Sequence, residues 1–178
     1  MYYKTIYPSP VGLITLACDE FSLVGLWIEG QKYHGNSAPG TTMEKDDTRV
    51  FGKVKDWLGR YFSGDKLDIS GLPLAPAGSA FRKEVWAMLC EIPYGRLTTY
   101  GDIAGRIAAN RGKETFSSRA IGGAVGHNPI SIIIPCHRVV GANGSLVGYA
   151  GGVDVKAKLL ELEGVDISCV LKNSKKSR

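Results

Sequence analysis

The chain has 178 residues, of which 44% are hydrophobic and 22% are charged, and these proportions are typical of a globular protein with a full core. No apolar stretch approaches the length of a membrane span, and the N-terminus leads directly into strand-like sequence, which predicts no signal peptide and no membrane partner. The four cysteines lack CxxC spacing, so we expect free thiols in a cytoplasmic protein.

The net charge of +5 is unevenly distributed. Four of the positive charges come from the tail, residues 169–178, which we expect to be a disordered basic end, and the rest of the chain carries only +1. Residues 79–128 hold seven Lys or Arg against four acidic residues. This modest bias is compatible with contacts to phosphate groups but does not establish them.

The first third of the chain predicts a small antiparallel sheet followed by one helix. Strand-like runs at 3–7, 13–18 and 23–28 are bounded by turn residues, and the polar residues 34–48 predict a loop. From residue 50 to 62, apolar residues recur at helical spacing and predict a helix with an aromatic core face.

A segment rich in Gly and Pro, residues 70–79, is the best candidate for a linker. We therefore place one domain at 1–75 and a second at 76–168. Three short helices are expected in the second domain. Ser79 can cap the first, Thr99 can cap the second, and Ser117 or Ser118 opens the third.

The third predicted helix carries few side chains that could read base edges. It contains Gly122 and Gly123, and two consecutive glycines cost about 2 kcal/mol of helix propensity. A small-residue face with Arg119 at its start suits the minor groove, where little sequence information can be read. The alternative is that the glycines allow tight packing against the domain's own core. A helix, a turn and a helix are weak evidence for DNA binding, because many helical hairpins bind nothing.

The apolar run at 130–134 predicts a buried strand that leads to Cys136. The thiolate is the nucleophilic form of cysteine, and the imidazole of His137 on the next residue could remove the thiol proton. Taken alone, a cysteine after an apolar run is most often a small buried hydrophobic residue, and Cys136 is promoted to a nucleophile only by the residues around it. The histidines and cysteines do not cluster at metal-ligand spacing, so we expect neither a metal nor a cofactor.

Six segments together resemble the O6-alkylguanine-DNA alkyltransferase family, in which they occur in the same order. The resemblance is specific over about 80–164 and looser over the N-terminal part. It implies an α/β (α+β) fold, in which a small ribonuclease-H-like antiparallel sheet plus helix precedes a mostly helical domain with a winged-helix-like helix-turn-helix. The segments are Ile92-Pro93-Tyr94-Gly95, Thr99-Tyr100-Gly101-Asp102-Ile103-Ala104, Arg119-Ala120-Ile121-Gly122-Gly123-Ala124, Asn128-Pro129, Ile134-Pro135-Cys136-His137-Arg138-Val139 and Gly148-Tyr149-Ala150-Gly151-Gly152.

The resemblance implies a suicidal DNA repair reaction. The alkyl group of O6-methylguanine, and as a further candidate that of O4-methylthymine, would pass from duplex DNA to Cys136. His137 would remove the thiol proton through a water molecule, and Glu163 would orient His137. A thioether is not a leaving group at neutral pH, so one molecule would act once.

The resemblance also implies that the damaged base rotates out of the duplex. Arg119 matches the family's intercalating arginine, and Tyr100 matches a tyrosine that displaces the phosphate and donates a hydrogen bond to the base. Asn128 matches an asparagine hinge between the DNA-binding helices and the active-site strand. The expected minor-groove contacts come from the small residues that follow the arginine, Ala120, Gly122 and Gly123.

Backbone groups would recognise the flipped guanine. By similarity, the carbonyls of Cys136 and Val139 would accept from the exocyclic amine, the amide of Ala150 would donate to the substituted oxygen, and Tyr149 would wall the pocket. Ser131 stands where some relatives have proline, which is expected to alter how a bulky alkyl group fits.

Three other functions fit parts of the sequence. A lesion-sensing relative that flips alkylguanine without transferring anything would lack the cysteine that is present here. A transcription factor would need sequence-reading side chains and usually dimerisation, and a cysteine hydrolase would need an oxyanion hole and a separate cleft. The resemblance implies a methylated-DNA–protein-cysteine methyltransferase that acts on double-stranded DNA, and we expect a monomer because nothing in the sequence calls for a protein partner.

Overall fold

The computed structural model describes residues 1–35 and 42–168, and it begins with a four-stranded sheet in the order β3-β2-β1-β4. The strands β1 (Tyr2–Ser9), β2 (Gly12–Cys18) and β3 (Leu23–Ile28) pair antiparallel, as the sequence predicted. The short strand β4 (Thr42–Glu44) pairs parallel with β1 and lies in the segment that was expected to be a loop. Polar residues and a length of three residues leave β4 without a periodic signal.

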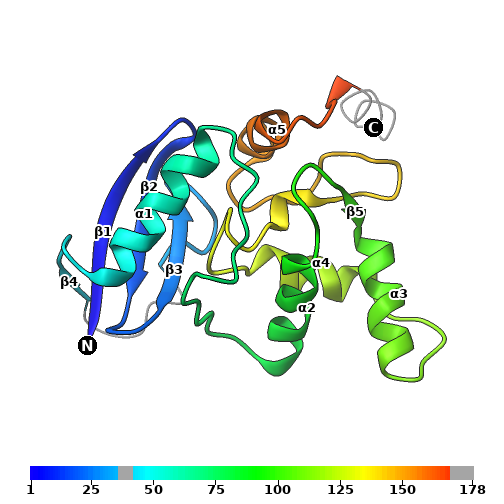
Figure 1. Cartoon of the computed structure of the whole chain (residues 1–178). Coiled ribbons are helices and arrows are strands. Elements are labelled where there is room, and N and C mark those ends of the chain that lie inside the picture. Colours follow the sequence, from blue (N-terminus) through cyan, green and yellow to red (C-terminus); the bar gives the residue numbers. More distant parts are fainter. Residues whose placement is uncertain (36–41, 169–178) are drawn as a thin grey trace.

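Helix α1 (Arg49–Phe62) covers one face of this sheet (Figure 1). Its buried side chains are the apolar stripe that predicted the helix, and they pack against the inward residues of β2 and β3. Side chains alternate between the two faces of a strand, so Ile14 and Leu16 face α1 while Thr15 and Ala17 face away.

The second half contains α2 (Ala80–Cys90), α3 (Tyr100–Asn110) and α4 (Ser118–Gly126), followed by α5 (Val153–Leu162). The three predicted caps are confirmed: the hydroxyl groups of Ser79, Thr99 and Ser117 each accept from the backbone N–H three residues later. A two-stranded parallel pair, β5 (Thr98–Thr99) and β6 (Val139–Val140), lies beside α3 and completes the winged-helix-like part.

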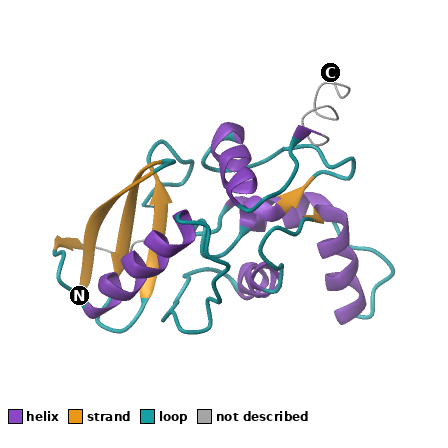
Figure 2. Ribbon diagram, turned by 45° about the horizontal axis from the view of Figure 1, so that its top comes forward, coloured by secondary structure: helices purple, strands orange, loops and turns teal. Residues whose placement is uncertain are grey.

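The sheet with α1 and the group α2 to α4 stand on opposite sides of the molecule (Figure 1, Figure 2). Backbone hydrogen bonds join the two parts, because Leu26 N–H donates to the Pro129 carbonyl at 2.9 Å and Ser131 N–H donates to the Leu26 carbonyl at 3.0 Å. One hydrophobic core spans both parts. The segment that leads to Cys136 therefore lies at the boundary between them. The tail expected at 169–178 lies outside the described residues.

Candidate active site

Cys136 begins a short 3-10 helix, η1 (Cys136–Arg138), and its side chain is 4% exposed. The prediction of a buried strand at 130–134 is wrong: these residues form a turn in which only Ile130 bridges to Leu26. Ile132 has φ of 69°, a left-handed conformation that a β-branched residue rarely adopts. An apolar run without alternation cannot distinguish a strand from a buried turn.

The Asn128 side chain supplies hydrogen bonds at both ends of this turn. Its Oδ1 accepts from the Ile130 N–H at 3.0 Å, and its Nδ2 donates to the Ile134 carbonyl at 2.8 Å. The same Nδ2 lies 3.0 Å from Cys136 Sγ and donates to the sulfur. One buried amide thus satisfies two backbone groups of the turn and places a donor on the thiol.

His137 and Glu163 form a buried pair behind Cys136. His137 Nε2 lies 2.7 Å from Glu163 Oε1, and both side chains are inaccessible to solvent. A carboxylate only accepts hydrogen bonds, so Nε2 carries the imidazole proton and Nδ1 is left as an acceptor. Within the described part of the chain, Nδ1 has no hydrogen-bond partner. Burial lowers the pKa of His137, which keeps the imidazole neutral and basic at Nδ1.

Glu163 accepts five hydrogen bonds, all from buried or partly buried donors. Oε1 accepts from His137, from the Tyr61 hydroxyl at 2.9 Å and from Arg138 Nη2 at 2.9 Å. Oε2 accepts from Arg138 Nε and from the Gly95 N–H, each at 2.9 Å. Burial alone would raise the pKa of Glu163, but hydrogen bonds from His137 and Arg138, together with the charge of Arg138, hold it at about 2. The carboxylate is therefore ionised at any physiological pH.

Gly95 shows how closely this network is packed. Its φ is 71°, and a Cβ at this position would lie 2.8 Å from the Glu163 carbonyl oxygen. The turn that follows α2 therefore also packs directly against Glu163. No other residue type fits there, because both the conformation and the space demand glycine.

Lys156 is a buried cation that the sequence did not single out. Its side chain is fully buried in α5, and Nζ donates to the carbonyls of Val139 and Val147. Burial lowers its pKa to about 8, while the nearby Cys136 sulfur opposes that shift. The sequence did contain a sign that Lys156 is buried. Lys156 and Glu163 share the helical spacing i, i+3, i+4, i+7 with two leucines, and residues at this spacing face the core.

Burial raises the pKa of the Cys136 thiol, whereas the Asn128 amide and the charge of Lys156 act in the opposite direction. Burial disfavours the charged thiolate, so the sulfur rests as a thiol. Chemistry at Cys136 therefore requires a base, and the neutral His137 on the next residue is suited to that role.

A cavity of about 530 Å³ opens beside α3 and α4. Tyr100, Arg119 and Gly122 line it together with Val147 and Gly148, so the structure brings together three of the residues predicted to contact DNA. The Tyr100 hydroxyl donates to the Val147 carbonyl at 3.2 Å. Burial and the nearby Cys136 raise the pKa of Tyr100 to about 12, so the phenol remains a hydrogen-bond donor.

Gly122 and Gly123 of α4 make no close packing contact with the rest of the described protein. A Cβ on Gly123 would meet nothing within 4 Å in the described part of the protein, and one on Gly122 would meet only the Tyr100 ring at 4.0 Å. Arg119 is exposed at the start of the helix, and Ala120 is partly buried next to it. The alternative that the glycines pack tightly against the core is therefore not supported.

The predicted guanine-recognition groups already have protein partners. The Val139 carbonyl accepts from Lys156, and the Cys136 carbonyl accepts from the Val139 N–H. Each carbonyl has two lone pairs, so one remains for a ligand. The Tyr149 side chain is buried. Ala150 is partly buried, and the buried Ser131 donates to Gln31 Oε1 at 3.0 Å.

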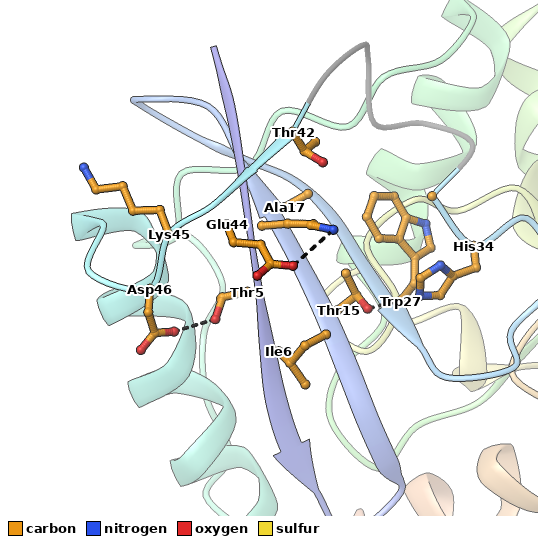
Figure 3. A pocket seen from close by; sticks show the side chains of 12 residues that line it. Thr5, Ile6, Thr15, Ala17, Trp27, His34, Thr42, Glu44, Lys45 and Asp46 are labelled. Carbon is orange, nitrogen blue, oxygen red and sulfur yellow. Dashed lines mark hydrogen bonds and ion pairs between the residues drawn. The ribbon is translucent and has the colours of Figure 1, made fainter.

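A larger cavity lies elsewhere, on the outer face of the N-terminal sheet (Figure 3). It measures about 760 Å³, and Trp27 and His34 stand at one side while Glu44 and Asp46 stand at the other. His34, Gly35 and Thr42 at its rim border residues 36–41, and none of the predicted site residues lines this cavity.

Residues 1–35 and 42–168 contain no group of three metal-ligating side chains, and their cysteines, Cys18, Cys90 and Cys136, are free. Among the same residues, no helix has the length and apolar character needed to cross a membrane. The geometry thus defines a class: a small α/β protein in which a buried cysteine, backed by a histidine and a carboxylate, lies beside a helix-turn-helix.

Comparison with known proteins identifies the family. Residues 1–76 match the ribonuclease-like domain of 6-O-methylguanine DNA methyltransferase, and residues 80–165 match the DNA binding domain of the same family. A Haemophilus influenzae relative named methylated-DNA–protein-cysteine methyltransferase is 45% identical over 92% of this chain and 87% of its own length. A Methanosarcina acetivorans relative of the same name is 45% identical over 92% of this chain and 99% of its own length.

A solved structure of Mycobacterium tuberculosis OGT in complex with DNA is similar over 91% of each chain, with a TM-score of 0.77 and 39% identity. An O6-methylguanine DNA methyltransferase from Methanococcus jannaschii is similar over 91% of this chain and 94% of its own, with a TM-score of 0.63 and 29% identity. The chain belongs to the 6-O-methylguanine DNA methyltransferase family, which confirms the resemblance that the motifs indicated, and its N-terminal part has the family's ribonuclease-like fold.

Proposed function

We propose that this protein repairs DNA by direct reversal: it transfers the alkyl group of O6-methylguanine in duplex DNA to Cys136, once per molecule. The observation that carries this proposal is the placement of the buried thiol on the residue before a neutral, carboxylate-bound histidine. A lesion-binding module or a transcription factor would not need this arrangement. O4-methylthymine is a second candidate substrate, because its alkyl group has the same chemistry.

Activation of Cys136 falls to His137. Glu163 fixes the tautomer by accepting from Nε2, so Nδ1 can take the thiol proton through a water molecule. Asn128 and Lys156 favour the thiolate that results, the first by a hydrogen bond and the second by its charge. Asn128 therefore acts on the reacting sulfur itself, in addition to its expected role as a hinge.

The transfer itself is a displacement at the alkyl carbon. A bond forms between Cys136 Sγ and that carbon, the bond from carbon to the guanine oxygen breaks, and the electron pair leaves with guanine. The guanine anion then takes up a proton from water, and His137 returns the thiol proton to water, so that both end neutral. The Tyr100 phenol, which stays protonated, supplies a hydrogen bond to the departing base. The product thioether does not react further at neutral pH, so the protein is consumed.

Access to the base requires that it leave the duplex. We assign Arg119 to fill the vacated space, because it is exposed at the start of α4 and lines the same cavity as Tyr100. The open space at Gly123 fits a close approach of the DNA backbone to α4. Ala120 and Gly122 would join this contact in the minor groove, which predicts binding with little sequence preference.

The guanine pocket would be formed by residues 136–150. We assign the free lone pairs of the Cys136 and Val139 carbonyls to the exocyclic amine, and the Ala150 N–H to the substituted oxygen. Tyr149 would wall the pocket, and Ser131 would influence the size of alkyl group accepted. The hydrogen bond from Lys156 to the Val139 carbonyl supports this assignment, because it fixes the position of that carbonyl.

We further propose domains at 1–75 and 76–168, a monomeric state and a cytoplasmic location with access to the chromosome. Free thiols support the location, since a nucleophilic Cys136 must remain reduced.

The test is to mix the protein with duplex DNA carrying one O6-methylguanine and to measure intact and peptide masses. We expect a gain of one CH2 unit confined to the Cys136 peptide, ending after one event per molecule, with the Cys18 and Cys90 peptides as internal controls. An unchanged mass with retained DNA binding would instead indicate a lesion-binding module. DNA with unmodified guanine is the matched substrate control.

A further inference from the structure

Tyr61 connects the N-terminal part of the molecule to the histidine–carboxylate pair. It lies on α1, 102 residues before Glu163 in the sequence, and its hydroxyl donates to Glu163 Oε1 at 2.9 Å. The same oxygen accepts from His137 Nε2 at 2.7 Å. The sequence assigned Tyr61 only to an aromatic core stripe, yet its hydroxyl shares an acceptor atom with the proposed base.

The ring of Tyr61 is held firmly in place. It stacks on Trp57 with ring centroids 5.2 Å apart and an interplanar angle of 8°, and it meets the edge of Tyr94 at 6.1 Å. Its exposed fraction is only 1%. Burial and the charge of Glu163 raise the pKa of Tyr61 far above its usual range, so the phenol always donates.

We propose that Tyr61 is a positioning residue through which the ribonuclease-like domain sets the basicity of His137, an inference that rests on the proposed function. Packing alone would require only the ring at position 61. The hydroxyl adds a third donor to Oε1, and each donor withdraws electron density from that oxygen.

The direction of the effect follows from the charges around the pair. Removing the Tyr61 hydroxyl makes Glu163 a stronger acceptor for His137 Nε2–H, which stabilises the imidazolium and raises the pKa of His137. The other ionisable groups that face the pair stay in place in such a variant: Arg138 in η1, Lys156 in α5, Cys136 beside the histidine, and Tyr94 and Tyr149 nearby.

The first measurement uses nuclear magnetic resonance of protein labelled with nitrogen-15 in histidine. The chain has three histidines, so His34 and His127 serve as internal references. In Tyr61→Phe we expect the His137 titration to move to higher pH by on the order of one unit, since a hydrogen bond to a charged group contributes about this much. At each pH, the signals of His34 and His127 should have the same chemical shifts in Tyr61→Phe as in the unaltered protein.

The second measurement is the rate of methyl transfer to Cys136 as a function of pH. In Tyr61→Phe the rising limb should shift to higher pH in parallel with the His137 titration, while the plateau at alkaline pH is retained. Damage to packing would lower the plateau without shifting the limb, and that result would overturn the proposal.

Tyr94→Phe is the matched control, because it removes a neighbouring phenol that donates to the Leu162 carbonyl at 3.0 Å instead of to the carboxylate. It should shift neither the titration nor the rate profile. Equal shifts in both variants, or an unchanged His137 in Tyr61→Phe, would refute the proposal. Absence of transfer by the unaltered protein would refute the proposed function alone, since the magnetic resonance measurement needs no DNA.

Discussion

At the scale of single residues, Asn128 has two separable tasks. Its oxygen accepts from the backbone of the turn before Cys136, and its nitrogen donates both to that turn and to the sulfur. An asparagine-to-aspartate change keeps the acceptor and the shape but removes both donors. The structure therefore offers a way to test the effect on chemistry apart from the loss of the whole side chain.

We predict that Asn128→Asp slows methyl transfer by about tenfold or more while the protein remains folded, because a donor worth about 1–2 kcal/mol to the thiolate is lost and a negative charge is added beside it. Both variants should lower the free energy of unfolding, since each loses the donor to the Ile134 carbonyl, and Asn128→Ala also loses the acceptor for the Ile130 N–H. Transfer rates under single-turnover conditions, together with urea unfolding, check both variants. Equal transfer rates in Asn128→Asp and the unaltered protein would refute a role at the sulfur.

At the scale of secondary-structure elements, packing between a glycine and an aromatic ring shapes strand β3. The Trp27 ring lies directly over Gly25 two residues earlier, so that a Cβ on Gly25 would fall within the indole. Trp27 is 2% exposed and packs with Ala17, Val24 and Tyr2 on the outer face of the sheet. The glycine in the strand is thus explained by its neighbour, as a site of close approach.

We predict that Gly25→Ala destabilises the protein by about 1–3 kcal/mol, because the indole must leave its place and expose apolar surface. Gly52→Ala is the matched control: it lies on the exposed side of α1 with open space around it, and it should stabilise by about 0.5–1 kcal/mol through helix propensity. Urea unfolding followed by tryptophan fluorescence measures both. A stability loss of the same size in both variants would show that the ring is not the cause.

Elements were predictable from the sequence where their signals are local. The caps at Ser79, Thr99 and Ser117 depend on contacts three residues along the chain, and all three were found. The run at 130–134 was misassigned because its backbone is satisfied by bonds within the turn, by one residue of β3 and by the Asn128 side chain, none of which periodicity reports. Tyr61 was assigned to the core alone, because its polar partner is distant in the sequence.

At the scale of the whole molecule, the Glu163 carboxylate joins segments that are far apart in the sequence. It follows α5 and accepts from α1, from the turn after α2 and from η1. The resemblance identified Glu163 and His137, but only the folded structure shows that the N-terminal part and the turn at Gly95 contact the same carboxylate. Ionisation of this one group therefore contributes to the stability of the whole protein.

The pKa of Glu163 is about 2 in the folded protein, below the 4.5 of a free side chain, so its contribution to folding is complete above about pH 5 and is lost as the pH falls toward 2. We predict that Glu163→Gln lowers the free energy of unfolding at pH 7 by about 3 kcal/mol, and that the gap to the unaltered protein narrows by most of that amount at pH 3. Glu161→Gln, which removes an exposed carboxylate two residues away, should leave both values unchanged. Urea unfolding at the two pH values provides the comparison. A gap that stays constant between pH 7 and pH 3 would mean that folding does not shift the pKa of Glu163, which would contradict the stabilisation of the ionised carboxylate by its five donors.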